Sequence, residues 1–157
     1  MPTNLFISFA QENREQLESL RALAKNPEHK LEFHDRSELE PVKDRAGTPL
    51  PYPPNDHRAD SVRKELKKLF DKATKMVVIV GESTHESQWI NWEIRTFHDR
   101  KKKYPGKTKK RIRAMKLKGC HDAILPKAIQ DLSIPVMNWD LKAFYSWLIT
   151  NPTDKNG

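Results

Sequence analysis

The amino-acid sequence predicts an α/β domain, a parallel sheet with helices on both of its faces. The order of strand-like and helix-like segments along the chain supports this fold class. Short apolar or alternating runs, typical of strands, take turns along the chain with segments whose apolar residues recur every three or four positions, as in helices. Strands and helices that alternate in this way are usually joined into parallel sheets by right-handed crossovers. The 157 residues suffice for a single domain, which we expect to span residues 1–150, with a tail at 151–157.

The amino-terminal part of the chain predicts two strands separated by a helix. Residues 5–9 form an apolar run, and residues 31–34 alternate apolar with polar side chains as an outer strand does. Helical spacing connects the apolar residues between them, Leu17, Leu20, Leu23 and Ala24. Five of the 11 prolines fall between residues 41 and 54. Residues 36–57 are therefore expected to form a long loop, a length typical of lids, binding loops or disorder.

The middle of the chain predicts the centre of the sheet. Residues 76–80 form an unbroken apolar run, which indicates a strand buried on both faces. A helix precedes it, with apolar residues at Val62, Leu66, Leu69, Phe70 and Ala73. A polar turn at residues 81–86 follows, and then a helix that either Ser83 or Ser87 is placed to cap.

The last third of the chain continues the alternation. We expect a strand near residues 112–117, a short helix near 123–129, a strand at 134–137 and a final helix at 141–149. Parallel sheets bind ligands at the carboxyl ends of their strands. A functional site is therefore expected in the turns that follow residues 9, 34, 80 and 117.

The composition excludes several classes of protein. The longest apolar run is far below the ~20 residues of a membrane-spanning helix, and the first residues do not form a secretory signal, so a cytoplasmic location is expected. Cys120 is the single cysteine, which excludes an internal disulfide and a multi-cysteine zinc site. The five glycines stand singly, so the nucleotide-binding glycine motifs are absent. The histidines form no metal-binding motif, and we predict no metal site.

The positive charge is concentrated in one segment. Residues 95–118 contain twelve Lys or Arg and one acid, a net +11 within a total of +8. Such a tract is either a solvated helix end and loop or a patch for phosphate, RNA or an acidic partner. Only Phe97 and Tyr104 are aromatic within it, which disfavours a stacking platform for single-stranded nucleic acid.

Glu93 lies beside the apolar face of its predicted helix, four positions after Trp89 and four before Phe97. A carboxylate there is costly unless it is paired or faces a cleft. It is therefore a structural partner of a base such as Arg95 or Lys64, a group that reaches water at the edge of the helix, or a catalytic acid.

Two further features can be interpreted either as structural or chance features or as functional ones. Trp89 is in phase with the apolar face and is expected in the core, whereas Trp92 is out of phase and either packs or contacts a partner. Cys120, His121 and Asp122 are interpreted as neighbours by chance, because catalytic groups are normally gathered from separate elements.

Three stretches together resemble the Toll/interleukin-1 receptor (TIR) family. Residues 5–9, Leu-Phe-Ile-Ser-Phe, are similar to its opening strand, and residues 76–83 resemble its central strand and the following turn. Residues 87–93 are similar to the family's Ser-x-Trp-x-x-x-Glu, whose glutamate is catalytic in the enzymatic members. The resemblance is greatest to the bacterial TIR-like, signal-producing subunit of Thoeris anti-phage defence. It implies a flavodoxin-like fold with a central parallel five-stranded sheet.

The resemblance implies an NAD+ nucleosidase that cleaves the bond between nicotinamide and ribose, with NAD as substrate and no cofactor. The ADP-ribose product would be released, cyclised or passed to an acceptor, and would reach a separate effector as a diffusible messenger. Self-association and a phage-derived trigger are implied as well. Neither a membrane nor nucleic acid is expected as a partner.

Position by position, the resemblance makes Glu93 the catalytic residue. It implies five substrate-binding residues, Ser8, Phe9, Asp35, Ser83 and Trp89. Cleavage builds positive charge on the ribose, which a fixed carboxylate stabilises, while nicotinamide leaves without a second acid. The diphosphate is expected to meet backbone N–H groups at the helix start, near residues 83–87.

The alternative is a non-catalytic module. Many TIR domains are adaptors that assemble and catalyse nothing, so the fold alone does not establish an enzyme. In that case Trp92 and residues 36–57 would form the contact surfaces.

Overall fold

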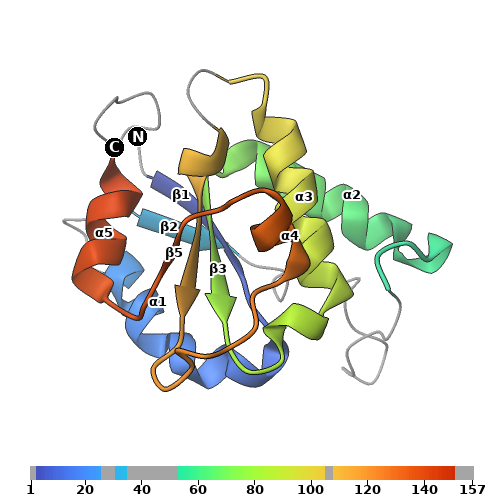
Figure 1. Cartoon of the computed structure of the whole chain (residues 1–157). Helices are drawn as coiled ribbons and strands as arrows, with labels where there is room; N and C mark the ends of the chain where they lie inside the picture. Colours follow the sequence, from blue (N-terminus) through green and yellow to red (C-terminus); the bar gives the residue numbers. More distant parts are fainter. Residues whose placement is uncertain (1–2, 26–30, 35–52, 105–107, 151–157) are drawn as a thin grey trace.

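A computed structural model gives the structure of the chain and describes residues 3–25, 31–34, 53–104 and 108–150 (Figure 1). Its centre is a five-stranded sheet with the strand order β2-β1-β3-β4-β5, and every neighbouring pair is parallel. The strands are β1 (Thr3–Ser8), β2 (Leu31–His34), β3 (Lys75–Val80), β4 (Ile112–Lys116) and β5 (Val136–Met137). The predicted fold class is confirmed, with β2 at an edge and β3 in the centre.

Helices cover both faces of this sheet (Figure 1). One face carries α1 (Glu18–Lys25) and α5 (Leu141–Ile149). The opposite face carries α2 (Asp60–Lys72), α3 (Gln88–Lys101) and α4 (Lys127–Asp131). Short 3-10 turns stand before α1, α2, α3 and β4, namely η1 (Gln11–Leu17), η4 (His57–Ala59), η5 (Thr84–Glu86) and η6 (Thr108–Arg111).

Alternation along β1 sends successive side chains to opposite faces of the sheet. Phe6 points to the face with α2 and α3, where its ring meets that of Phe70 edge-on, with 4.9 Å between the centroids. Leu5 and Ile7 point to the face with α1 and α5. Because Ser8 is in phase with Phe6, its side chain also turns toward α3. All six residues of β3 are buried, as expected of a strand with helices on both faces.

Two elements differ in detail from the predictions, and one of the two predicted helix caps is found. Helix α4 begins at Lys127, later than residue 123, because Pro126 disfavours helical backbone at the residue before it and itself takes the N-cap position. Strand β5 has only two residues, Val136 and Met137. Ser87 caps α3, since its Oγ accepts a hydrogen bond from the Ile90 N–H at 3.2 Å.

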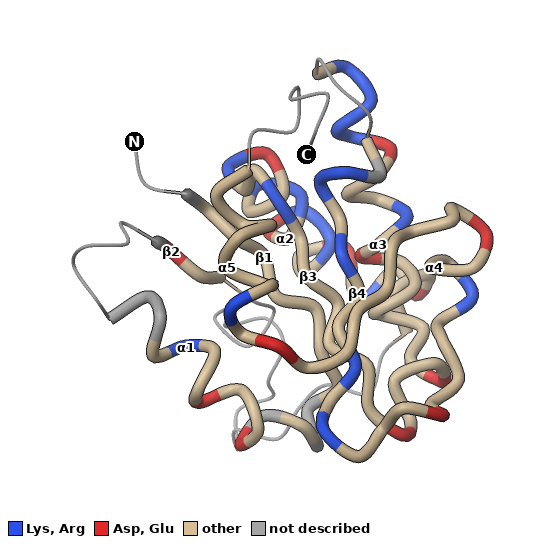
Figure 2. Tube along the Cα trace, turned by 60° about the vertical axis from the view of Figure 1, so that its left-hand side comes forward, with Lys and Arg blue, Asp and Glu red and all other residues tan. Residues whose placement is uncertain are grey.

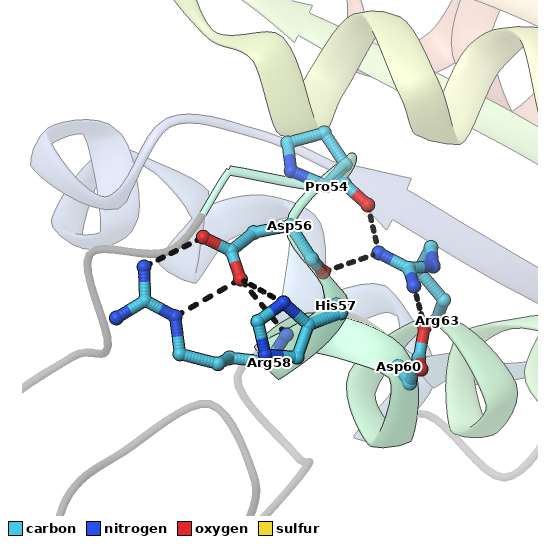
Figure 3. A network of polar contacts seen from close by, with 6 residues as sticks. All are labelled: Pro54, Asp56, His57, Arg58, Asp60 and Arg63. Atoms are coloured by element: carbon cyan, nitrogen blue, oxygen red, sulfur yellow. Dashed lines mark hydrogen bonds and ion pairs between the residues drawn. The ribbon is translucent and has the colours of Figure 1, made fainter.

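Much of the predicted long loop, residues 35–52, lies outside the described residues, but its end is described. Figure 3 shows how polar contacts fix this end to the start of α2. The Asp56 carboxylate accepts three hydrogen bonds from Arg58, which lower the pKa of Asp56 well below its usual range. Arg63 donates to the carbonyl oxygens of Pro54 and Asp56 and pairs with Asp60.

None of the helices in the described parts of the chain is both long and apolar enough to cross a lipid bilayer.

Candidate active site

The candidate site forms where the end of β1 meets the buried face of α3. Ser8 is the last residue of β1 and therefore marks the carboxyl edge of the sheet. Its Oγ donates a hydrogen bond to Glu93 Oε1 at 2.9 Å. Both side chains are buried, with 1% of each residue exposed. A carboxylate removed from water needs hydrogen-bond donors, and Ser8 supplies one from the neighbouring element.

Helix α3 is held in place at its start and along its length. Beyond the Ser87 cap, Asn91 bridges two elements: its Nδ2 donates to the Ser87 carbonyl at 3.0 Å, and its Oδ1 accepts from the Ala128 N–H of α4 at 2.8 Å. Ile90 and Ile94 are fully buried against the sheet. The position of Glu93 is therefore set by a rigid helix rather than by a loop, as a precise chemical group requires.

The structure bears on two interpretations of Glu93. Arg95, one of the two bases considered as its partner, is directed instead to Asp131, with 2.9 Å between its Nη2 and Asp131 Oδ2. The expectation that Glu93 reaches water at the edge of the helix is wrong, because only 1% of the residue is exposed. Glu93 is instead a buried acid that contacts the carboxyl end of β1.

Among the predicted substrate-binding residues that the structure describes, Ser8 contacts Glu93. The Phe9 side chain lies in the other apolar cluster, with Leu17 and Leu20, and the Arg21 guanidinium lies 6.0 Å from the centre of its ring. Alternation explains this, since Phe9 follows Ser8 and so turns to the opposite face. Asp35 lies outside the described residues, and its role stays a prediction.

Ser83 and Trp89 lie at the same end of the sheet. Ser83 is half-buried in the turn after β3, and Trp89 is half-buried in the first turn of α3. The rings of Trp89 and Trp92 meet edge to face at 5.7 Å, and Trp92 also lies 6.1 Å from Phe70. Trp92 therefore packs at the margin of the core. Substrate contacts of Ser83 and Trp89 stay predictions.

Asn13 is a residue at this edge that sequence reasoning missed. Its side chain, in the turn after β1, packs directly on Gly81 in the turn after β3, where a Cβ would meet Asn13 Oδ1 at 2.6 Å. Asn13 is 8% exposed, and its Oδ1 has no hydrogen-bond donor among the described residues. The one available signal was its position after a strand end, because no periodicity distinguishes it.

The turn after β3 is organised by a second missed residue, Thr84. Its Oγ1 accepts from the Gly81 N–H at 2.8 Å and donates to the Ile79 carbonyl at 3.3 Å. The N–H groups of Glu86 and Ser87 donate to carbonyls within the turn. Two of the amides expected to meet a diphosphate near residues 83–87, those of Glu86 and Ser87, thus already have partners inside the chain.

Cys120 and His121, which are neighbours in the sequence, have separate surroundings in the structure. His121 Nδ1 lies 3.3 Å from Asn138 Oδ1 in an exposed turn, whereas Cys120 packs against the apolar cluster beneath α5. Within the described ranges, no group of three or more His, Cys, Asp or Glu side chains is placed to hold a metal ion.

Comparison with models of protein families shows to which family the chain belongs. The model of the Thoeris protein ThsB, TIR-like domain, matches residues 6–118, most of the chain. The chain belongs to this ThsB TIR-like family. Membership confirms the resemblance seen in the sequence and gives the chain a TIR-domain role in Thoeris defence. The family match includes Ser8, Asn13, Gly81 and Glu93, all at the carboxyl edge of the sheet.

The other comparisons of this ThsB TIR-like domain were with curated proteins and with solved structures. A search of curated proteins found no match. Among solved structures, the TIR domains in a structure of the activated Roq1 resistosome directly recognizing the pathogen effector XopQ align over 92% of this chain and 69% of that chain. The sequence identity is 12% and the TM-score is 0.46.

Proposed function

We propose that this domain cleaves NAD at the bond between nicotinamide and ribose, with Glu93 as the catalytic carboxylate. The observation that supports the proposal best is the placement of Glu93. It is a buried acid on a rigid helix, it is hydrogen-bonded to Ser8, and it lies at the edge where parallel sheets bind ligands. Membership in the ThsB TIR-like family supports the same activity.

The chemistry requires a group of this kind. When the bond to nicotinamide breaks, positive charge develops on the ribose ring, as in the oxocarbenium-like transition states of glycosidases. A fixed carboxylate in a site that excludes water stabilises that charge far more than the same group would in solution. The Ser8 hydroxyl would keep Glu93 Oε1 in position, and the second oxygen would face the ribose. The ADP-ribose unit would then become the basis of a diffusible signal, with NAD as a substrate and not a cofactor.

The burial of Glu93 affects how the proposed activity would be regulated. With 1% of the residue exposed, NAD does not reach the carboxylate in the arrangement described. The proposed activity therefore requires that the surroundings of Glu93 open. We expect self-association, a phage-derived trigger, or both to supply this change, so that the dilute resting protein is silent.

The proposal is tested in cells that express the protein, with and without phage infection, by mass spectrometry of small molecules. We expect infection to lower NAD and raise nicotinamide and an ADP-ribose derivative in the parent. Glu93→Gln should abolish these changes. Glu86→Gln, which neutralises an exposed acid just before α3, is the matched control and should retain them. Equal responses of the parent and Glu93→Gln would refute the assignment.

A non-catalytic assembly module is the second candidate, and one observation favours it. A buried acid that is hydrogen-bonded to a neighbouring strand can have a purely structural role, which is to fix α3 against β1. This candidate predicts no change in NAD under any trigger, together with concentration-dependent association. Because Trp92 packs against Phe70, Trp92→Ala would also disturb the core, so association must be compared at equal stability.

A further inference from the structure

The part of the basic tract at the end of α3 and the start of β4 lies at the end of the sheet opposite the candidate active site. Figure 2 shows Lys and Arg gathered where α3 ends and β4 begins. Glu93 and Lys101 are eight residues apart on α3, which at 1.5 Å per residue separates them by about 12 Å along the helix. Any ligand of this end would therefore not touch Glu93.

Several cations of the tract, and Lys75 outside it, have clear partners within the fold. Arg100 forms two hydrogen bonds to the Asp71 carboxylate, at 2.8 and 2.5 Å, and joins α3 to α2. Lys75, at the start of β3, donates to the carbonyls of Trp147 and Thr150 and so caps the end of α5. Arg95 pairs with Asp131. These cations therefore connect elements of the fold.

Lys101, Lys103 and Arg111 lie around the ring of Tyr104. Their cationic groups lie 4.9, 5.5 and 5.6 Å from its centre. Lys101 is 3% exposed, and its Nζ also lies 5.3 Å from the centre of the Phe97 ring. In the described part of the chain, the Lys101 ammonium has neither a hydrogen-bond acceptor nor a carboxylate within ion-pair distance. Aromatic rings attract a cation but cannot accept the three hydrogen bonds that an ammonium offers.

Burying the Lys101 ammonium in this way lowers the stability of the folded chain when no ligand is bound. Burial and the nearby positive charges of Arg111, Lys103 and Arg100 lower the pKa of Lys101 to about 8. Asp71, the acid that opposes this effect, is already held by Arg100. An apolar side chain at position 101 would fill the same space without this penalty. A bound anion would remove it, because it supplies acceptors and negative charge together.

We propose that Lys101, Lys103 and Arg111 form a binding site for a small polyanion that carries two or more phosphate groups. The planar guanidinium of Arg111 suits bidentate binding of phosphate, and the two ammonium groups add charge. Phe97 and Tyr104 are the aromatic residues of the tract, and because Phe97 is buried, Tyr104 alone could stack on a base. That favours a compact phosphate ligand over single-stranded RNA. The proposal is independent of the proposed NAD cleavage.

Thermal unfolding of the full chain with tripolyphosphate tests this site. At a concentration about a hundredfold above Kd, we expect the Tm of the parent to rise by roughly 5–10 °C. Lys101→Met should raise the Tm without ligand, because it removes a buried charge, and should abolish the rise caused by tripolyphosphate. Lys67→Met removes an exposed charge on α2 and is the matched control, which should retain the full rise.

A second variant keeps the test decisive if Lys101→Met folds poorly. Lys103 is exposed, so Lys103→Gln should leave folding intact and weaken tripolyphosphate binding about threefold. An equal rise of Tm in the parent, Lys101→Met and Lys103→Gln would overturn the proposal, as would the absence of any rise in the parent. A short single-stranded RNA that binds the parent more tightly than tripolyphosphate does would also overturn it.

Discussion

At the scale of single residues, the hydrogen bond from Ser8 to Glu93 determines whether the candidate site can be stable in the resting protein. A buried carboxylate loses its interactions with water, and a donated hydroxyl replaces part of them. Both Ser8 and Glu93 were expected at the site through the family resemblance, whereas the place of Glu93 on an apolar helix face left structural and catalytic roles open. Their direct contact could not be predicted, because spacing along a helix does not define which strand end it meets.

Removing this donor gives a stability prediction. Ser8→Ala should lower the free energy of unfolding by about 1.5–3 kcal/mol, because the buried carboxylate loses a charge-assisted hydrogen bond. In the Glu93→Gln background the same change should cost less, about 1 kcal/mol, because the acceptor is neutral. Urea unfolding of the four proteins measures the coupling, with Ser19→Ala as an exposed control. Identical costs in both backgrounds would contradict the role assigned to the contact.

At the scale of elements, the turns after β1 and β3 lock together through Asn13 and Gly81. The sequence predicted that both turns lie at one edge of the sheet, since parallel strands share that edge. It gave no sign of the packing between them, because a glycine's need for space depends on what lies opposite. The same limit applied to α4, whose start was shifted by Pro126.

The close approach of these turns predicts the effect of one methyl group. Gly81→Ala would place a Cβ 2.6 Å from Asn13 Oδ1, so the buried Asn13 side chain would have to move. We expect a loss of about 1–3 kcal/mol in stability, measured by urea unfolding. Asn13→Ala should remove most of the penalty when combined with Gly81→Ala. If the double variant loses the sum of the two single effects, the steric explanation fails.

At the scale of the whole molecule, the domain has a buried acid at one end of the sheet and a basic cluster at the other. The alternation of strands and helices predicted the sheet, its central strand and its outer strand. The sequence could not predict which cations of the basic tract form ion pairs. Arg95 and Arg100 pair with acids far away in the sequence, whereas Lys101 packs between aromatic rings.

The buried lysine makes stability depend on pH in a definite direction. Its pKa is about 8 in the folded protein and 10.5 ordinarily, so between these values the unfolded chain binds more protons. Stability should therefore rise from pH 8 to pH 10, by on the order of 1–3 kcal/mol from this group. The neighbours Arg100, Arg111, Lys103 and Asp71 are shared by the parent and Lys101→Met, so the difference between the two unfolding profiles isolates Lys101. If the free energy of unfolding changed with pH in the same way for the parent and Lys101→Met, the prediction would be contradicted.

The proposed function requires that the Glu93 carboxylate act on the ribose of NAD. The most direct measurement is nicotinamide release by the purified protein, in the presence of extract from phage-infected cells, for the parent and Glu93→Gln. The account predicts a rate at least about 100-fold lower in Glu93→Gln, with a Tm equal to or above that of the parent, since an amide is easier to bury than a carboxylate. Equal rates of nicotinamide release from two equally folded proteins would contradict it.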